Sequence, residues 1–266
     1  MDKGATFRSL HDKTFIMPNP SDVGTARYLE ALGFKAIATS SAGYAFSRAL
    51  PDGGVRFEEM IAHCREMAAA VAIPVSADLE KGKGDSADSA AETVFAAEAA
   101  GLAGCSIEDF SGDPGKPIYD FEHAVERVRA AAEAARALKR DFVFTARTEN
   151  FLHGRPDLDD TIRRLQHFAE AGADVLFAPG ISDTATLATI CKAVGKPVSV
   201  IAPKDASVAS LATAGIRRIS TGPRLTQAMF RAVGDAAREM LDRGTFTFTG
   251  EVTPFAELQS LFGSRQ

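Results

Sequence analysis

A repeated junction, in which a helical stretch ends in glycine and passes directly into a β-rich run, constrains the fold of this chain most strongly. It occurs at Gly33, Gly101, Gly172, Gly195 and Gly215. Glycine commonly ends a helix because it adopts the left-handed conformation without a steric penalty. The strands that this spacing predicts are residues 14–17, 34–39, 73–77, 102–107, 142–146, 175–178, 198–202 and 216–221. Amphipathic helical stretches separate them, as βα units require.

Strands that alternate with helices form a parallel sheet, and about eight such units in 266 residues favour a closed (β/α)8 barrel of the TIM type. An open doubly wound sheet is the alternative. It usually contains fewer strands, and no glycine fingerprint opens the first helix of this chain. At the N-terminus, Phe7 and Leu10 indicate a short helix that covers the bottom of the barrel.

No linker or low-complexity segment divides the chain, so we predict one barrel domain over residues 1–243. Residues 244–266 are predicted to form a C-terminal arm, with a hairpin or extended stretch followed by a short helix. Aromatic residues in this arm, among them Phe246 and Phe255, indicate packing on the barrel or on a neighbouring subunit.

Composition and charge narrow the functional classes. The net charge is −5, and the Lys and Arg residues form no continuous stripe, which argues against a nucleic-acid partner. No apolar run reaches membrane-spanning length. The three cysteines, Cys64, Cys105 and Cys191, are scattered without metal-ligand spacing and fit a reducing compartment. We therefore predict a cytoplasmic protein that acts on small molecules.

Two carboxylates follow the predicted strand 73–77. Asp78 and Glu80 stand two positions apart, so in an extended chain they point to the same side. Carboxylates at the end of a buried strand are costly unless a positive group lies between them, and a hard divalent cation is the best candidate. The alternative is a strand that runs out into a solvated acidic loop.

Polar residues also follow the neighbouring predicted strands. Ser40 and Ser41 follow the second strand, Glu108 and Asp109 the fourth, and Arg147 and Glu149 the fifth, whereas strands six to eight end nearly bare. In a (β/α)8 barrel the chemistry sits at these carboxyl ends. Acids on one rim require a cation, and Arg147 requires an anion that its planar fork can bind. The pattern predicts a pocket for a metal-bound carboxylate. The alternative is a structural ring of ion pairs between Arg147 and Glu108 or Glu149.

Five segments together resemble a known enzyme family. They are residues 18–22 (Pro-Asn-Pro-Ser-Asp), 40–43 (Ser-Ser-Ala-Gly) followed by Pro51-Asp52, 78–84 (Asp-Leu-Glu-Lys-Gly-Lys-Gly), 106–109 (Ser-Ile-Glu-Asp) and 146–149 (Ala-Arg-Thr-Glu). In this order and spacing they resemble the isocitrate lyase / phosphoenolpyruvate mutase superfamily, and the likeness extends over roughly residues 7 to 245.

The resemblance implies an Mg²⁺-dependent enzyme, with Mn²⁺ as an alternative ion, that binds a 2-oxo acid or dicarboxylate and breaks or forms C–C or P–C bonds through an enolate. The implied fold is a barrel whose last helix is exchanged between the subunits of a dimer or tetramer. The resemblance implies that Asp78 binds the metal and that Glu80 and Glu108 hold metal-bound water. It implies that Ser40, Ser41 and Ala42 bind the substrate carboxylate and that Arg147 pairs with a substrate oxygen. Asp52 would face the substrate or support the residues that do.

The loop after the fourth predicted strand departs from this family. Residues 110–118 contain no Cys, His or Asn, whereas isocitrate-type lyases carry a Cys-Gly-His stretch there and mutases carry an asparagine. His153, after the fifth strand, is the leading candidate for the missing proton donor, and a solvated loop histidine is the alternative. Tyr44, Tyr119 and Lys116 are weaker candidates.

The leading functional hypothesis is cleavage of a C–C bond in an oxaloacetate-like acid, by decarboxylation or hydrolysis. P–C bond chemistry on a phosphonopyruvate-like compound is the second hypothesis, and a low-turnover protein that binds metal and carboxylate is the third. An aldolase-like enzyme with a phosphate site at residues 220–224 is disfavoured, because it requires a Schiff-base lysine on a strand or another metal set, and no predicted strand contains an inward lysine.

Overall fold

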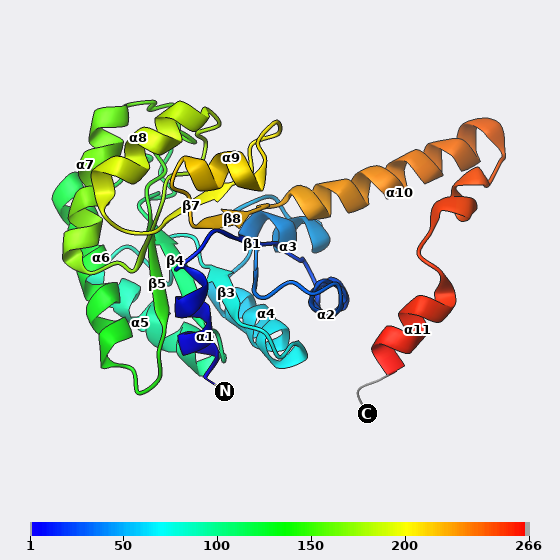
Figure 1. The fold of residues 1–266 in the computed structure, drawn as a ribbon, viewed down its shortest axis with the longest axis horizontal. Helices are drawn as coiled ribbons and strands as arrows, with labels where there is room; N and C mark the ends of the chain where they lie inside the picture. Colours follow the sequence, from blue (N-terminus) through cyan, green and yellow to red (C-terminus); the bar gives the residue numbers. More distant parts are fainter. Residues whose placement is uncertain (1, 264–266) are drawn as a thin grey trace.

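Eight parallel strands form a nearly closed barrel in the computed structural model, which describes residues 2–263 (Figure 1). The hydrogen-bonded order β1-β8-β7-β6-β5-β4-β3-β2 returns the last strand to the side of the first. The strands are β1 (Phe15–Met17), β2 (Ile37–Ala38), β3 (Val75–Asp78), β4 (Gly104–Glu108), β5 (Val143–Arg147), β6 (Val175–Phe177), β7 (Val198–Ile201) and β8 (Arg218–Ser220). The (β/α)8 prediction is confirmed, and each predicted strand contains most of an observed one.

Helices follow the strands and surround the barrel (Figure 1). Most of them begin at a side chain that caps the first turn, such as Asp22, Ser86, Asp157 or Asp183. They are α1 (Lys3–Leu10), α2 (Val23–Ala31), α3 (Ser41–Ser47), α4 (Phe57–Ala70), α5 (Ala87–Ala99), α6 (Phe121–Ala137), α7 (Leu158–Ala171), α8 (Thr184–Val194), α9 (Val208–Thr213), α10 (Arg224–Arg243) and α11 (Phe255–Gly263). None of the helices within residues 2–263 has the length and apolarity to cross a membrane.

Strands β1 and β2 stand at the two ends of the hydrogen-bonded order and do not pair with each other, and Asn19 connects them. Its side-chain nitrogen donates to the carbonyl of Thr39 at 2.9 Å. Its side-chain oxygen accepts from the backbone N–H of Thr221 at 2.8 Å and of Gly222 at 3.0 Å. One buried amide thus connects the carboxyl ends of β1, β2 and β8, because it offers both donors and acceptors.

Helix α1 covers the bottom of the barrel, as Phe7 and Leu10 predicted. Phe7 is fully buried and packs edge-on against Phe15 and His11. Gly104 of β4 lies under this ring, since a Cβ there would stand 2.4 Å from the carbonyl oxygen of Val143 and 3.0 Å from the Phe7 ring. The bottom of the barrel is therefore filled by apolar packing, and its top is left for the site.

The 20-residue helix α10 projects from the barrel and leads into the C-terminal arm (Figure 1). A short 3-10 helix, Thr247–Glu251, reverses the chain, and α11 returns to α2, where the Arg27 guanidinium donates to the carbonyl of Leu261 at 3.3 Å. The stretch predicted as a hairpin or extended chain contains a tight turn, because Glu239 accepts from the backbone N–H and the hydroxyl of Thr247. The short helix of the prediction corresponds to α11. Residues 1 and 264–266 of the predicted ranges 1–243 and 244–266 lie outside the described residues.

Candidate active site

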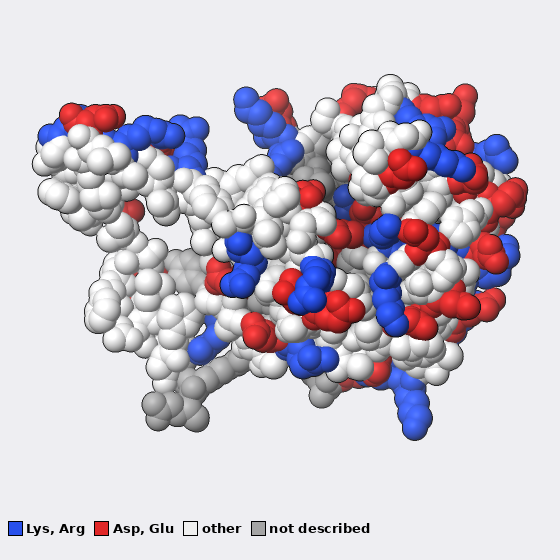
Figure 2. Space-filling view, turned by 180° about the vertical axis from the view of Figure 1, so that it is seen from behind, with Lys and Arg blue, Asp and Glu red and all other residues white. Residues whose placement is uncertain are grey.

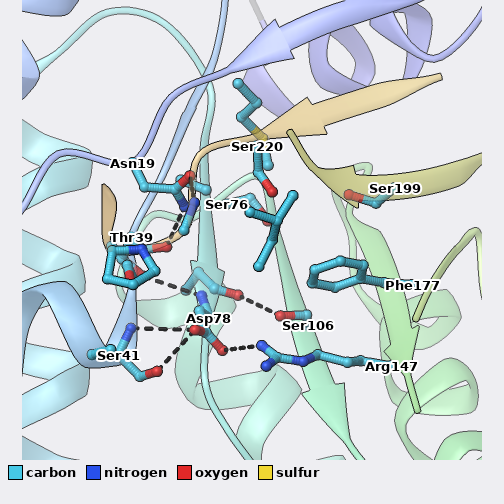
Figure 3. A pocket seen from close by; sticks show the side chains of 18 of the residues that line it. Asn19, Thr39, Ser41, Ser76, Asp78, Ser106, Arg147, Phe177, Ser199 and Ser220 are labelled. Atoms are coloured by element: carbon cyan, nitrogen blue, oxygen red, sulfur yellow. Dashed lines mark hydrogen bonds and ion pairs between the residues drawn. The ribbon is translucent and has the colours of Figure 1, made fainter. Parts of the chain in front are cut away.

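A cavity of about 400 Å³ opens at the carboxyl ends of the strands and continues into the barrel (Figure 3). Its upper wall carries Ser40, Ser41, Asp52, Asp78 and Arg147. Its lower wall is built from small or hydroxyl-bearing residues of the strands: Ala38, Ser76, Ser106, Ser199 and Ser220. A second hollow beside it includes Glu80, Glu108, Glu149 and His153. The structure therefore brings most of the sequence-predicted site residues to one end of the barrel: Ser40, Ser41, Ala42, Asp52, Asp78, Glu80, Glu108, Arg147 and His153.

Asp78, the last residue of β3, is held from two sides (Figure 3). One carboxylate oxygen accepts from the backbone N–H of Ser41 at 3.2 Å and from its hydroxyl at 2.9 Å. The other oxygen lies 3.3 Å from a guanidinium nitrogen of Arg147. These contacts fix the orientation of Asp78, so the alternative of a solvated acidic loop is wrong for this residue.

Arg147, at the end of β5, is the positive centre of the rim. Its Nε donates to Glu149 and lies 3.4 Å from Glu108, and its side chain is only 13% exposed. Burial alone would lower the pKa of Arg147, but the charges of Glu108, Glu149 and Asp78 raise it above its ordinary value. The ring of ion pairs that was the alternative to a substrate pocket therefore exists, and Arg147 also lines the cavity.

Glu80 does not continue the strand. Strand β3 ends at Asp78, and Glu80 has a φ of +51°, so the two side chains do not follow the alternation assumed for an extended chain. Both side chains still line the rim, Asp78 in the main cavity and Glu80 in the hollow beside it. Burial first, and then the charges of Asp78 and Asp52, raise the pKa of Glu80 to about 7.

Excess negative charge characterises this rim. Burial raises the pKa of Glu108 well above its ordinary value, and Glu149, Asp78 and Glu80 raise it further against the opposing effect of Arg147. Partial desolvation and the charge of Asp78 also raise the pKa of Asp52. The single positive charge of Arg147 thus faces several carboxylates and cannot neutralise all of them.

A divalent cation fits this charge imbalance. Within residues 2–263, no group of three or more His, Cys, Asp and Glu side chains forms a closed metal cage. Mg²⁺ does not require one, because it usually binds one or two carboxylates and completes its octahedron with water and ligand oxygens. Asp78, with Glu80 and Glu108 behind it, supplies hard oxygen donors of that kind.

The segment Ser40–Ala42 lies at the start of α3. The Ser40 hydroxyl caps this helix by accepting from the N–H of Gly43 at 3.1 Å, and both donors of Ser41 are directed at Asp78. Ala42 is buried against the cavity. The contact between Ser41 and Asp78 was not predicted, because it joins residues 37 positions apart on different βα units.

Two expectations about the strand ends are wrong. Asp109 does not face the cavity, since its carboxylate accepts from Thr148, from the N–H of Glu149 and from Arg164. Strands six to eight are not bare, because Phe177, Ser199, Arg218 and Ser220 line the cavity from within the strands. These side chains lie within the strands, whereas the predicted rim residues follow the strands. The alternation of Arg218 and Ser220 along β8 is the signal that could have found them.

His153 stacks on Phe110, with ring centroids 3.9 Å apart, and its Nε2 lies 3.4 Å from a carboxylate oxygen of Glu149. It is thus tied to the rim and not simply solvated. The weaker candidates are elsewhere: Tyr44 stacks on His63, Tyr119 donates to Asp85, and Lys116 pairs with Asp120 at 2.5 Å.

A buried arginine of α6 holds the loop that carries Glu80. The Arg127 guanidinium donates to the carbonyl oxygens of Lys81, Gly84 at 2.7 Å and Ser86 at 3.0 Å. The Lys81 ammonium in turn donates to the carbonyl of Ser111 at 2.8 Å. The loops after β3 and β4 are therefore joined, and the sequence analysis did not identify Arg127 as part of this support.

Comparison with known proteins agrees with this geometry. The profile of the phosphoenolpyruvate phosphomutase family matches residues 7–241. A solved structure of a lyase/mutase-type protein from Burkholderia cenocepacia superposes with a TM-score of 0.97 at 47% identity, covering 99% of this chain and 96% of that one.

Two curated enzymes are also similar. The 2-methylisocitrate lyase of Escherichia coli is 35% identical over 189 residues, which cover 66% of this chain and 62% of that enzyme. The oxaloacetate decarboxylase of Pseudomonas paraeruginosa is 29% identical over 247 residues, which cover 88% of this chain and 84% of that enzyme.

The raised pKa of Glu80 generates a prediction about stability. In the folded chain Glu80 keeps its proton up to about pH 7, whereas in the unfolded chain it loses the proton near its ordinary pKa of 4.5. The contribution of Glu80 to stability therefore falls as pH rises from about 4.5 to about 7. We expect Glu80→Gln to become increasingly more stable than wild type over this window. Urea denaturation in metal-free buffer at several pH values measures the difference.

Glu133→Gln, on the exposed face of α6, is the matched control, and its difference from wild type should stay constant with pH. If the Glu80→Gln difference were equally flat between pH 4.5 and 7, the charge crowding at the rim would be refuted.

Proposed function

The chain belongs to the isocitrate lyase / phosphoenolpyruvate mutase superfamily, and from this premise we propose that it is an Mg²⁺-dependent lyase that cleaves a C–C bond of a small, oxaloacetate-like 2-oxo acid. The observation that carries the proposal is the rim itself, where Asp78, Glu80 and Glu108 surround Arg147 with more negative charge than it neutralises. The similarity to an oxaloacetate decarboxylase supports the choice of substrate class.

In this proposal the rim holds the 2-oxo end of the substrate. Arg147 pairs with a substrate oxygen, and the substrate carboxylate lies against Ser40, Ser41 and Ala42 in the first turn of α3. Asp78 would bind the cation, with Glu80 and Glu108 holding its water ligands. When bound, Mg²⁺, or Mn²⁺ in its place, polarises the 2-oxo and carboxylate oxygens as a Lewis acid.

The proposed reaction balances with the residues present. The bond between C3 and the departing carboxylate breaks, CO₂ leaves, and the electron pair stays on the pyruvate part as its enolate. The guanidinium of Arg147 is already oriented by Glu149 and stabilises the developing charge without reorganisation. A proton then goes to C3, which gives pyruvate. Hydrolytic cleavage to oxalate and acetate is the variant in which water attacks the 2-oxo carbon.

We assign the proton donor role to His153. Its Nε2 faces Glu149 at 3.4 Å, and its ring is held flat against Phe110 at the entrance of the rim. Imidazole serves as an acid or base near neutral pH. The loop 110–118 lacks the Cys of the isocitrate-type lyases, so the donor must come from another element.

P–C bond chemistry on a phosphonopyruvate-like acid is the second candidate, because the matching family profile is that of a phosphomutase. A low-turnover protein that binds metal and carboxylate is the third. All three use the same rim, so a panel of substrates separates them.

We further propose that the enzyme is a cytoplasmic homo-oligomer, a dimer or tetramer, and that residues 244–266 form an arm that packs between subunits. Helix α10 buries only Thr226 and Glu239 in one chain and exposes Phe230, Val233 and Leu241. Figure 2 shows uncharged surface over much of the projecting part of the chain, with charged side chains gathered at its outer end. A second copy of the chain would cover this apolar surface. The free cysteines Cys64 and Cys105, both buried, are in keeping with a reducing compartment.

Pyruvate release from oxaloacetate in the presence of Mg²⁺ tests the function. We expect turnover of oxaloacetate, none after chelation, and a loss of at least about 100-fold in Asp78→Asn, as for the removal of one preorganised charge contact. Phosphonopyruvate and substituted malates complete the panel. Asp113→Asn, in the exposed loop after β4, is the control. Phosphate release from phosphonopyruvate alone would favour the second candidate, and binding of oxalate without any turnover would favour the third.

The assignment of His153 predicts a loss of chemistry with little loss of binding. His153→Gln should lower kcat by about 100- to 10,000-fold and leave KM within about threefold, because a proton donor acts in the transition state. Steady-state kinetics over pH measures this, and the limb due to the donor should disappear. His167→Gln on α7 is the control. An unchanged kcat would assign the proton to another group.

The proposed role of α10 predicts a change in assembly. Phe230→Glu combined with Val233→Glu should convert the oligomer to a monomer, because charges replace the exposed apolar side chains at an interface. Sedimentation velocity measures the mass, and Arg231→Gln on the same helix is the control. A monomeric wild type, or an oligomer that survives both glutamates, would exclude this interface.

A further inference from the structure

Arg218 is a buried cation with no anionic partner among residues 2–263. It is the first residue of β8 and only 3% exposed. Its Nε donates to the hydroxyl of Ser199 at 3.0 Å, and its Nη2 donates to the hydroxyl of Thr145 at 3.1 Å. The remaining nitrogen, Nη1, has no hydrogen-bond partner among residues 2–263. Arginine keeps its charge in proteins, so a buried guanidinium paired only with neutral hydroxyls is an uncompensated charge.

The surroundings of Arg218 offer no compensation. No Asp or Glu of residues 2–263 forms an ion pair with it, in contrast to Arg147 at the rim. The nearby His11 is neutral, because burial and then the charge of Arg218 lower its pKa to about 3. Burial alone lowers the pKa of Arg218 to about 9. A charged group in such a place is normally paired or bound to a ligand.

Arg218 lines the same cavity as the rim and lies at its lower end. Its side chain crosses the barrel interior from β8 to Thr145 on β5, and Thr145 precedes Arg147 by two residues on that strand. Two residues of a strand rise about 7 Å, so the two arginines bound the cavity from below and above at a spacing that a short carbon chain can bridge. The wall between them carries the hydroxyls of Ser76, Ser106, Ser199 and Ser220 (Figure 3).

The geometry points to Arg218 as the residue that recognises a second carboxylate at the far end of the substrate, inside the barrel. This inference rests on the proposed function, because it takes the 2-oxo end to be bound at Asp78 and Arg147, and it restricts the substrate to short dicarboxylates. A carboxylate matches the free Nη1 donor and the serine hydroxyls around it. A methyl group at the same place would leave the charge buried and unpaired.

Equilibrium binding of matched ligands tests this inference without turnover. Malate and 2-hydroxybutanoate share the chelating hydroxy-acid end and differ in a terminal carboxylate or methyl group, and oxalate has no far end. With Mg²⁺ present, calorimetric titration of the wild type should favour malate over 2-hydroxybutanoate by at least about 30-fold, as expected for a desolvated charge pair. Arg218→Met should reduce this preference to within about threefold and leave oxalate affinity within about twofold.

Arg217→Met is the matched control, since Arg217 directly precedes β8 and lines a separate hollow beside the ends of α8 and α9, so this variant should keep the malate preference. A malate preference retained in Arg218→Met would overturn the inference and leave a free inorganic anion as the partner of Arg218. If Arg218→Met lost oxalate binding through misfolding, the wild-type comparison would still decide, because equal affinity for malate and 2-hydroxybutanoate also overturns the inference.

Malate preference without turnover of oxaloacetate would support the role of Arg218 and reject the proposed reaction. Absence of oxalate binding in the wild type would reject the assignment of the 2-oxo end to the rim.

Discussion

The pairing of one buried guanidinium with several carboxylates is the interaction on which the rest of the site depends. Arg147 contacts Asp78, Glu108 and Glu149, and these residues come from the carboxyl ends of β3, β4 and β5 or directly after them. If Arg147 were removed, these carboxylates would face one another in a partly desolvated cavity, and burial would favour their neutral forms. With it, some remain charged and available to a cation. The barrel brings these residues together because parallel strands all end at the same edge.

Polar side chains outside this cluster hold the backbone of the loops around it. Arg127 reaches from α6 to the carbonyl oxygens of Lys81, Gly84 and Ser86, and so determines the path of the loop that carries Glu80. Asn19 does the same for the junction of β1, β2 and β8. In both cases a polar side chain satisfies backbone groups that no ladder satisfies, which a buried loop requires. The site is thus preorganised by backbone contacts as well as by charge.

The sequence predicted the barrel, the strand positions and the rim residues, because those depend on local patterns: glycine after a helix, short apolar runs and polar residues at strand ends. It did not predict the contact of Ser41 with Asp78, nor the role of Arg127, because each depends on which side chains meet across different βα units. The path at Glu80 was misjudged for a related reason, since a left-handed residue breaks the alternation of a strand without any glycine to signal it. Arg218 was overlooked because a pair of basic residues at the start of a strand is normally exposed to solvent. Only the folded barrel shows that the Arg218 side chain lies in its interior.

The two arginines of the cavity, Arg147 and Arg218, have different charged surroundings, so the two ends of the cavity favour ligands of opposite charge. Arg147 is surrounded by more acid than it can neutralise, so the rim as a whole attracts a cation. Arg218 has only hydroxyl partners, so the lower end attracts an anion. A ligand that carries a metal-chelating group at one end and a carboxylate at the other matches this polarity in one orientation only, because reversing it would leave a charge unpaired at each end. In the proposed reaction the same asymmetry keeps the 2-oxo group, whose oxygen takes up the enolate charge, beside Arg147, which stabilises that charge.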